Sequence, residues 1–79
     1  MDETRRAPRH RVLKTGTIDL GGGAIDCTVR NLSTTGAALE VINQAGIPEQ
    51  FTLVVAGDGL NQPCHIVWRK GSRIGVTFD

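Results

Sequence analysis

The stretch AIDCTVRNLSTTGAALEV, residues 24–41, contains two alternating segments separated by a polar break. In the first segment Cys27 and Val29 alternate with polar residues, which is the pattern of a half-buried strand. Residues 31–36 are mostly small and polar, and the apolar alternation resumes in residues 37–41. A turn explains the glycine in the break, but a turn alone does not require these polar side chains at this spacing. The stretch therefore predicts two adjacent strands joined by a polar turn.

Strand patterns continue along the chain after a basic leader. Strands are predicted at residues 14–20, 51–55, 64–69 and 74–78, and glycine-containing or proline-containing breaks lie at residues 21–23, 46–48, 57–59 and 71–72. No segment keeps a 3.6-residue period long enough to form a helix. The predicted fold is all-β, a small six-stranded antiparallel (split) β-barrel with a flexible basic N-terminal arm. We expect residues 1–12 to form the arm and residues 13–79 the barrel.

The same alternation assigns the large side chains and the two thiols to the interior. Phe51, Trp68 and Phe78 are predicted to face the core. Cys27 and Cys64 have neither the spacing of a zinc site nor the density of a disulfide scaffold. We expect both cysteines to be reduced core thiols.

Length and charge limit the possible functions. A chain of 79 residues makes one small domain, and its net charge of +1 favours neither nucleic acid nor a membrane surface. Five of the nine Lys and Arg residues nevertheless lie within the first 14 positions. No apolar run reaches the roughly 20 residues that span a bilayer, and no secretory signal core is present. We therefore expect a cytoplasmic protein without membrane insertion.

Catalysis is not indicated by the residue pattern. His10 lies in the charged leader and His65 on the expected outer face of a strand, so neither is positioned as a base for a nucleophile. The eight acidic residues are scattered singly, which does not favour a metal site. Residues 21–23 lack the lysine and the Ser or Thr of a phosphate-binding loop. We expect no catalytic residues, no metal ligands and no cofactor.

The leader sequence RRAPRHR, residues 5–11, is suited to binding an anion. Pro8 disfavours the helical conformation at Ala7, so this segment is predicted to be extended or tightly turned. The planar guanidinium group of arginine pairs with phosphates and with guanine, and it stacks on bases. A solvated basic tail is the alternative, because charged termini commonly have no partner.

Two motifs together resemble a known family. Arg5-x-x-x-Arg9 is followed, after 21 intervening residues, by Asn31-x-Ser33-x-x-Gly36. This order and spacing resembles the signature of PilZ domains, the bacterial receptors for cyclic di-GMP, in which an RxxxR arm precedes (D/N)xSxxG at the end of a barrel strand. The closing VWRKGSRIGVTF, residues 67–78, resembles the last hairpin of that family.

The resemblance implies a role for each motif residue. Arg5 and Arg9 would contact the phosphates and guanines of cyclic di-GMP, and Asn31 would offer its amide to a guanine edge. Ser33 would place a hydroxyl near the ligand, and Gly36 would let ligand and backbone approach closely. The alternative is that Asn31 and Ser33 bond the backbone of the turn, and that Gly36 provides a positive φ.

The chain also departs from the family pattern. Many members carry a further arginine just before the RxxxR pair, where this chain has Thr4, and Arg6 or Arg11 is the candidate replacement. We include Arg6 in the predicted ligand-binding set. The ligand stoichiometry therefore stays open, and the C-terminal helix of many members is not seen in the sequence.

The resemblance implies a cyclic di-GMP receptor or adaptor that signals to a separate protein partner. One alternative is a protein-interaction module that has lost nucleotide binding and docks a partner through a barrel edge or through Val54 and Val67. Nucleic-acid binding through the basic leader is disfavoured, because the aromatic residues assigned to the core leave no stacking platform.

Overall fold

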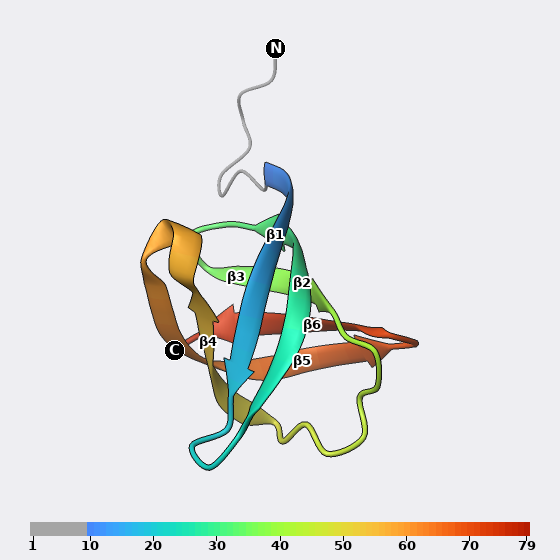
Figure 1. Cartoon of the computed structure of the whole chain (residues 1–79). Coiled ribbons are helices and arrows are strands. Elements are labelled where there is room, and N and C mark those ends of the chain that lie inside the picture. The colour runs from blue at the N-terminus through green and yellow to red at the C-terminus, as the bar shows by residue number, and fades with distance from the viewer. Residues whose placement is uncertain (1–9) are drawn as a thin grey trace.

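The structure is a computed structural model that describes residues 10–79, and it is built almost entirely from strands (Figure 1). The elements in chain order are β1 His10–Asp19, β2 Ala24–Leu32, β3 Gly36–Glu40, β4 Gln50–Val55, the 3₁₀ turn η1 Ala56–Asp58, β5 Leu60–Lys70 and β6 Arg73–Phe78. The predicted all-β class is confirmed. β1 begins four residues before the predicted strand, because its first residues pair with the end of β2.

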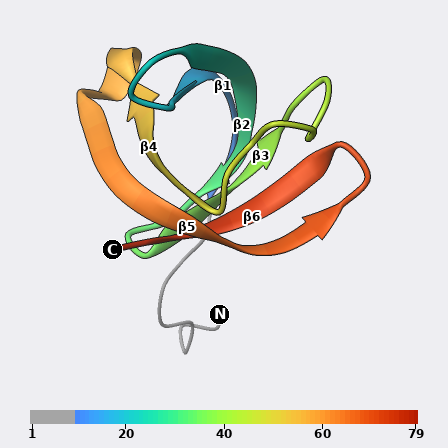
Figure 2. The ribbon, with the colours of Figure 1, turned by 90° about the horizontal axis from the view of Figure 1, so that it is seen from below.

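The six strands close into an antiparallel barrel in the order β1-β2-β3-β6-β5-β4 (Figure 2). β4 returns to β1 through the pairs Thr17↔Val54 and Ile18↔Leu53, and this pairing completes the barrel. The predicted six-stranded antiparallel barrel is therefore confirmed. No helix among residues 10–79 has the length and apolar character needed to cross a lipid bilayer.

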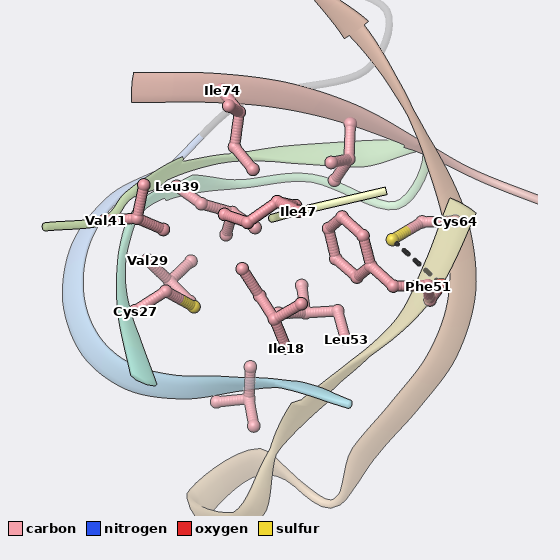
Figure 3. Packing of buried hydrophobic residues seen from close by; sticks show 12 residues of the cluster. Ile18, Cys27, Val29, Leu39, Val41, Ile47, Phe51, Leu53, Cys64 and Ile74 are labelled. Carbon is pink, nitrogen blue, oxygen red and sulfur yellow. Dashed lines mark hydrogen bonds between the residues drawn. The ribbon is translucent and has the colours of Figure 1, made fainter. Parts of the chain in front are cut away.

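Apolar side chains, most of them from the alternating strands, fill the barrel interior (Figure 3). Twelve side chains form the buried core: Ile18, Cys27, Val29, Leu39, Val41, Ile47, Phe51, Leu53, Val55, Cys64, Ile74 and Val76. Phe78 is partly buried and packs against this core, as predicted. Cys27 and Cys64 are free and buried, so the prediction of core thiols is confirmed. The pKa of each thiol is raised to about 11, mainly by burial and to a smaller extent by a nearby carboxylate.

The connection from β3 to β4 covers one opening of the barrel. It carries Ile47 into the core, and Nη2 of Arg69 donates a hydrogen bond to the Ile47 carbonyl oxygen at 3.1 Å. It also contacts the β5–β6 hairpin, where the Val41 N–H bonds the Ser72 carbonyl oxygen at 2.8 Å. The turn of that hairpin contains Gly71 with φ +59°, a conformation that favours glycine. These contacts fix the outer end of the hairpin.

Two irregularities in the pairing change which side chains face outward. Between Val29 and Asn31 the β2–β3 register shifts, and between Ile66 and Trp68 the β5–β6 register shifts. Each shift inserts one extra residue, which moves the following side chain to the opposite face. After the shift in β5, Trp68 faces outward and is 45% exposed. The prediction that Trp68 belongs to the core is therefore wrong.

Candidate ligand-binding site

The second of the two sequence motifs, Asn31-x-Ser33-x-x-Gly36, lies at the end of β2 and in the turn to β3, which we call the motif turn. Asn31 pairs with Arg11 of β1, and Leu32 pairs with His10, the first residue of β1. The chain therefore enters the barrel beside the motif. Arg5, Arg6 and Arg9 lie outside the described residues.

Asn31 faces the outside of the barrel. It pairs with Ala38 of β3, and the next residue of β3, Leu39, is fully buried and pairs with Val29. Because neighbouring residues of a strand point to opposite faces, Ala38 and its partner Asn31 point away from the core. The side chain of Asn31 is half-buried at this surface. Its predicted contact with a guanine edge stays a prediction.

The Ser33 hydroxyl organises the turn between β2 and β3. It accepts hydrogen bonds from the backbone N–H groups of Thr35 and Gly36, both at 3.2 Å. The backbone N–H of Ser33 also bonds the carbonyl oxygen of Gly36 at 2.9 Å. These are the local bonds that a serine makes in a turn. Ser33 thus has a structural role in this turn, and its predicted contact with a ligand stays a prediction.

Gly36 is required by the packing of the strands. Its φ is not positive, so the interpretation that the turn needs a positive φ is wrong. Gly36 pairs with Thr77 of β6, and a Cβ at this position would overlap the backbone carbonyl oxygen of Val76. The overlapped atom is part of the β3–β6 ladder, so it cannot rotate away as a flexible side chain would. The absence of a Cβ therefore lets β3 and β6 approach closely.

One cross-strand row connects the motif to Trp68. Asn31, Ala38, Gly75 and Trp68 are successive partners across β2, β3, β6 and β5. The two middle residues are small, and a Cβ at Gly75 would overlap the indole of Trp68. The indole therefore lies over the backbone of Gly75. This arrangement places an aromatic side chain on the same outer surface as Asn31.

A shallow hollow lies between the turn and the indole. Its volume is about 110 Å³, and its lining includes Thr35, Gly36, Ala38, Trp68 and Thr77. Such a hollow fits the edge of a planar group, with the aromatic side chain at one side. We did not predict this site for Trp68, although the sequence contains a signal for it. A two-residue turn at 71–72 places Trp68 opposite Gly75, which lies between two core residues of β6.

Polar groups elsewhere on the described chain are paired or dispersed. Nδ1 of His65 lies 2.7 Å from Oδ1 of Asp79, so this histidine is held at the end of β6. Lys14 binds Asp58 of η1 at 2.8 Å, and Arg30 binds Glu40 at 2.9 Å. Within residues 10–79 no three His, Cys, Asp or Glu side chains gather in a way that would hold a metal ion.

The described strands form a small antiparallel barrel domain, and its candidate site lies on the outside of the sheet. A family model for the PilZ domain matches residues 3–79, which is essentially the whole chain. The chain therefore belongs to the PilZ family, a family of cyclic di-GMP receptor domains that bind ligands and do not catalyse reactions. No curated protein sequence gives a significant match to the chain.

Proposed function

We propose that this PilZ domain binds cyclic di-GMP and passes the signal to a separate protein. The observation that carries the proposal is the pairing of His10 with Leu32 in the β1–β2 ladder. Arg9 is bonded to His10, and Leu32 lies between Asn31 and Ser33. This pairing supports a common site for the arginine arm and the second motif, although 21 residues separate Arg9 from Asn31 in the sequence.

The chemistry of the two parts is complementary to this ligand. Cyclic di-GMP carries two phosphodiester charges and two guanines. Arg5, Arg9 and the additional Arg6 supply guanidinium groups for the phosphates and for the guanine edges and faces. Asn31 supplies an amide that can both donate and accept hydrogen bonds at a guanine edge.

Trp68 adds a stacking surface that the sequence analysis did not include. Its indole is 45% exposed and borders the hollow beside the motif turn. Stacking of a base on an aromatic side chain contributes about 1–3 kcal/mol. In this proposal one guanine lies against Trp68, and its edge points toward Asn31.

A protein-interaction module without nucleotide binding is the second candidate. Val67, 54% exposed, and Ile42, 100% exposed, are apolar side chains that this candidate would use to contact a partner. Val54, which is predicted to have the same role, is only half-exposed. In the receptor proposal, Val67 also lies beside the bound nucleotide, so one partner can contact both.

Calorimetric titration of the purified chain with cyclic di-GMP tests the proposal, with GMP as the control. We expect saturable binding of cyclic di-GMP in the micromolar range, about −8 kcal/mol, and much weaker binding of GMP. Equal heats for both nucleotides, or none for either, would favour the interaction module.

A further inference from the structure

Two cationic side chains lie directly opposite each other at the outer end of the β5–β6 hairpin. Lys70 of β5 pairs with Arg73 of β6, and both side chains are exposed. Neither forms a salt bridge with a carboxylate of residues 13–79. Like charges at directly opposed positions destabilise a sheet. The pair thus works against the stability of the barrel, which points to a purpose other than folding.

The pair lies on the same outer surface as Trp68. Arg69 and Ile74 are partners between the two pairs, and Ile74 is fully buried, so this intermediate row faces inward. The rows on either side of it, Trp68 with Gly75 and Lys70 with Arg73, face outward. Two residues along a strand correspond to about 7 Å. The cationic pair is therefore one row away from the indole.

The nearest carboxylate already has partners. Glu40 of β3 is paired with Arg73 in the β3–β6 ladder, but its Oε1 binds Nη1 of Arg30 at 2.9 Å. Its Oε2 accepts a hydrogen bond from the Ser72 hydroxyl at 3.5 Å. Together with Arg30, which reaches Glu40 from the register shift in β2, the row of Glu40, Arg73 and Lys70 has three cationic side chains and one anionic side chain, which leaves an excess of positive charge.

The backbone that carries the pair is held in position. The Val41 N–H bonds the Ser72 carbonyl oxygen at 2.8 Å, and Nε2 of Gln44 donates to the carbonyl oxygen of Gly71. The end of the hairpin projects from the barrel in both ribbon views (Figures 1 and 2). A fixed backbone lowers the entropic cost of binding an anion.

We propose that Lys70 and Arg73 form a second anion-binding element, which takes the phosphate of the cyclic dinucleotide that lies away from the arginine arm. This inference rests on the proposed function. The His10–Leu32 pair and the cationic pair lie on opposite sides of the Trp68 row along the sheet, so in this proposal a ligand stacked on the indole presents its second phosphate to Lys70 and Arg73. The Arg73 guanidinium donates two parallel hydrogen bonds to one phosphate, and the Lys70 ammonium adds a point charge.

The test uses three variants that each remove one positive charge: Lys70→Gln, Arg73→Gln and the control Arg69→Gln. Arg69 shares the row of Ile74 and donates to the Ile47 carbonyl oxygen, and glutamine keeps an N–H donor at this position, so the control removes the same charge without facing the ligand. In calorimetric titrations with cyclic di-GMP we expect Lys70→Gln and Arg73→Gln each to weaken binding about tenfold. Arg69→Gln should stay within about twofold of the unmodified chain.

Thermal unfolding without ligand gives the second readout. Because the two cations repel each other, Lys70→Gln and Arg73→Gln should raise the thermal midpoint by about 1–5 °C while they lower affinity. A purely structural role would lower the midpoint instead. If the unmodified chain binds cyclic di-GMP but all three variants bind alike, the second element is overturned and the receptor function stands. If the unmodified chain does not bind, the receptor function is overturned, and the second element with it.

Discussion

The indole of Trp68 lies over the backbone of Gly75, its partner in the β5–β6 ladder. A side chain at position 75 would displace the indole, so the glycine and the tryptophan form one unit. The unit gives the outer surface of the sheet a flat aromatic area beside the motif turn, and it makes Trp68 available to a ligand.

Replacement of Trp68 by alanine should therefore weaken cyclic di-GMP binding by about 10-fold or more, since stacking contributes about 1–3 kcal/mol per base. Trp68 is the only tryptophan in the chain, so intrinsic fluorescence reports on this position alone. We expect the emission of the unmodified chain to change with cyclic di-GMP in a saturable way. Unchanged emission at saturating ligand would show that the base lies elsewhere.

Gly36→Ala should destabilise the ligand-free domain by about 1–3 kcal/mol, because the added methyl group overlaps the Val76 carbonyl oxygen in the β3–β6 ladder. Gly22→Ala is the matched control, since no heavy atom lies within 4 Å of its Cβ position and its φ is not positive. Urea unfolding of both variants measures the difference. Equal midpoints for the two variants would contradict the close approach of β3 and β6.

The affinity of Gly36→Ala for cyclic di-GMP is a separate measurement, made where circular dichroism shows the variant to be fully folded. A Cβ here reduces the hollow that Gly36 lines, so we expect lower affinity in the folded molecules as well. Near-normal affinity would remove Gly36 from the ligand-facing residues and leave only its role between the strands.

Ser33→Ala should lower the free energy of unfolding by about 1 kcal/mol, because the backbone N–H groups of Thr35 and Gly36 lose their acceptor. Ser33→Thr keeps the hydroxyl and serves as the control. Chemical denaturation without ligand measures this effect. A loss of cyclic di-GMP affinity larger than the loss of stability explains would assign Ser33 a ligand contact as well.

Arg9→Ala should abolish cyclic di-GMP binding and leave the thermal midpoint of the ligand-free domain nearly unchanged. The expectation follows from the proposed contact of the guanidinium with a phosphate, and from the buried core of the described residues, which is formed between Ile18 and Val76. Calorimetry and thermal unfolding of the same preparation measure both quantities. A large loss of stability would give Arg9 a structural role in place of the ligand contact.

The raised pKa values of the two buried thiols predict a loss of stability at alkaline pH. The pKa of each thiol rises from 9.0 to about 11 in the folded chain. Burial is the larger cause, and the second cause is the carboxylate of Asp26 for Cys27 and of Asp79 for Cys64. Because folding raises each pKa, the folded state favours the protonated thiol, and this preference stabilises the fold. The contribution is complete below pH 9.0 and is lost as the pH rises to about 11.

We therefore expect the free energy of unfolding to decrease between about pH 9 and pH 11, on the order of 2 kcal/mol per thiol. A Cys27→Ala, Cys64→Ala variant is less stable at neutral pH but should show a flatter pH dependence over this interval. Urea unfolding across the pH series compares the two proteins. Parallel curves would show that groups other than the thiols cause the decrease.

The sequence by itself determined the class of the fold and the position of the second motif. Strict alternation at Cys27 and Val29 requires one buried face, and glycine-rich breaks such as residues 21–23 limit the strand lengths. These signals act over a few residues, so they can be read without knowledge of the partner strands. The order and spacing of the motifs Arg5–Arg9 and Asn31–Gly36, together with the predicted barrel, also indicated the family, which the PilZ family match over residues 3–79 confirms.

Only the tertiary structure decided why Gly36 is a glycine, and only the pairing of β5 with β6 decided between the inward direction that the alternation of residues 64–69 predicts for Trp68 and the outward direction that the turn at 71–72 favours. The register shift after Ile66 reverses the side-chain alternation in β5, and a shift depends on pairing with β6. The space at Gly36 depends on Val76, which lies 40 residues further along the chain and becomes a neighbour only when β3 pairs with β6. Such contacts between distant residues arise from the closure of the barrel, and a local pattern carries no information about them.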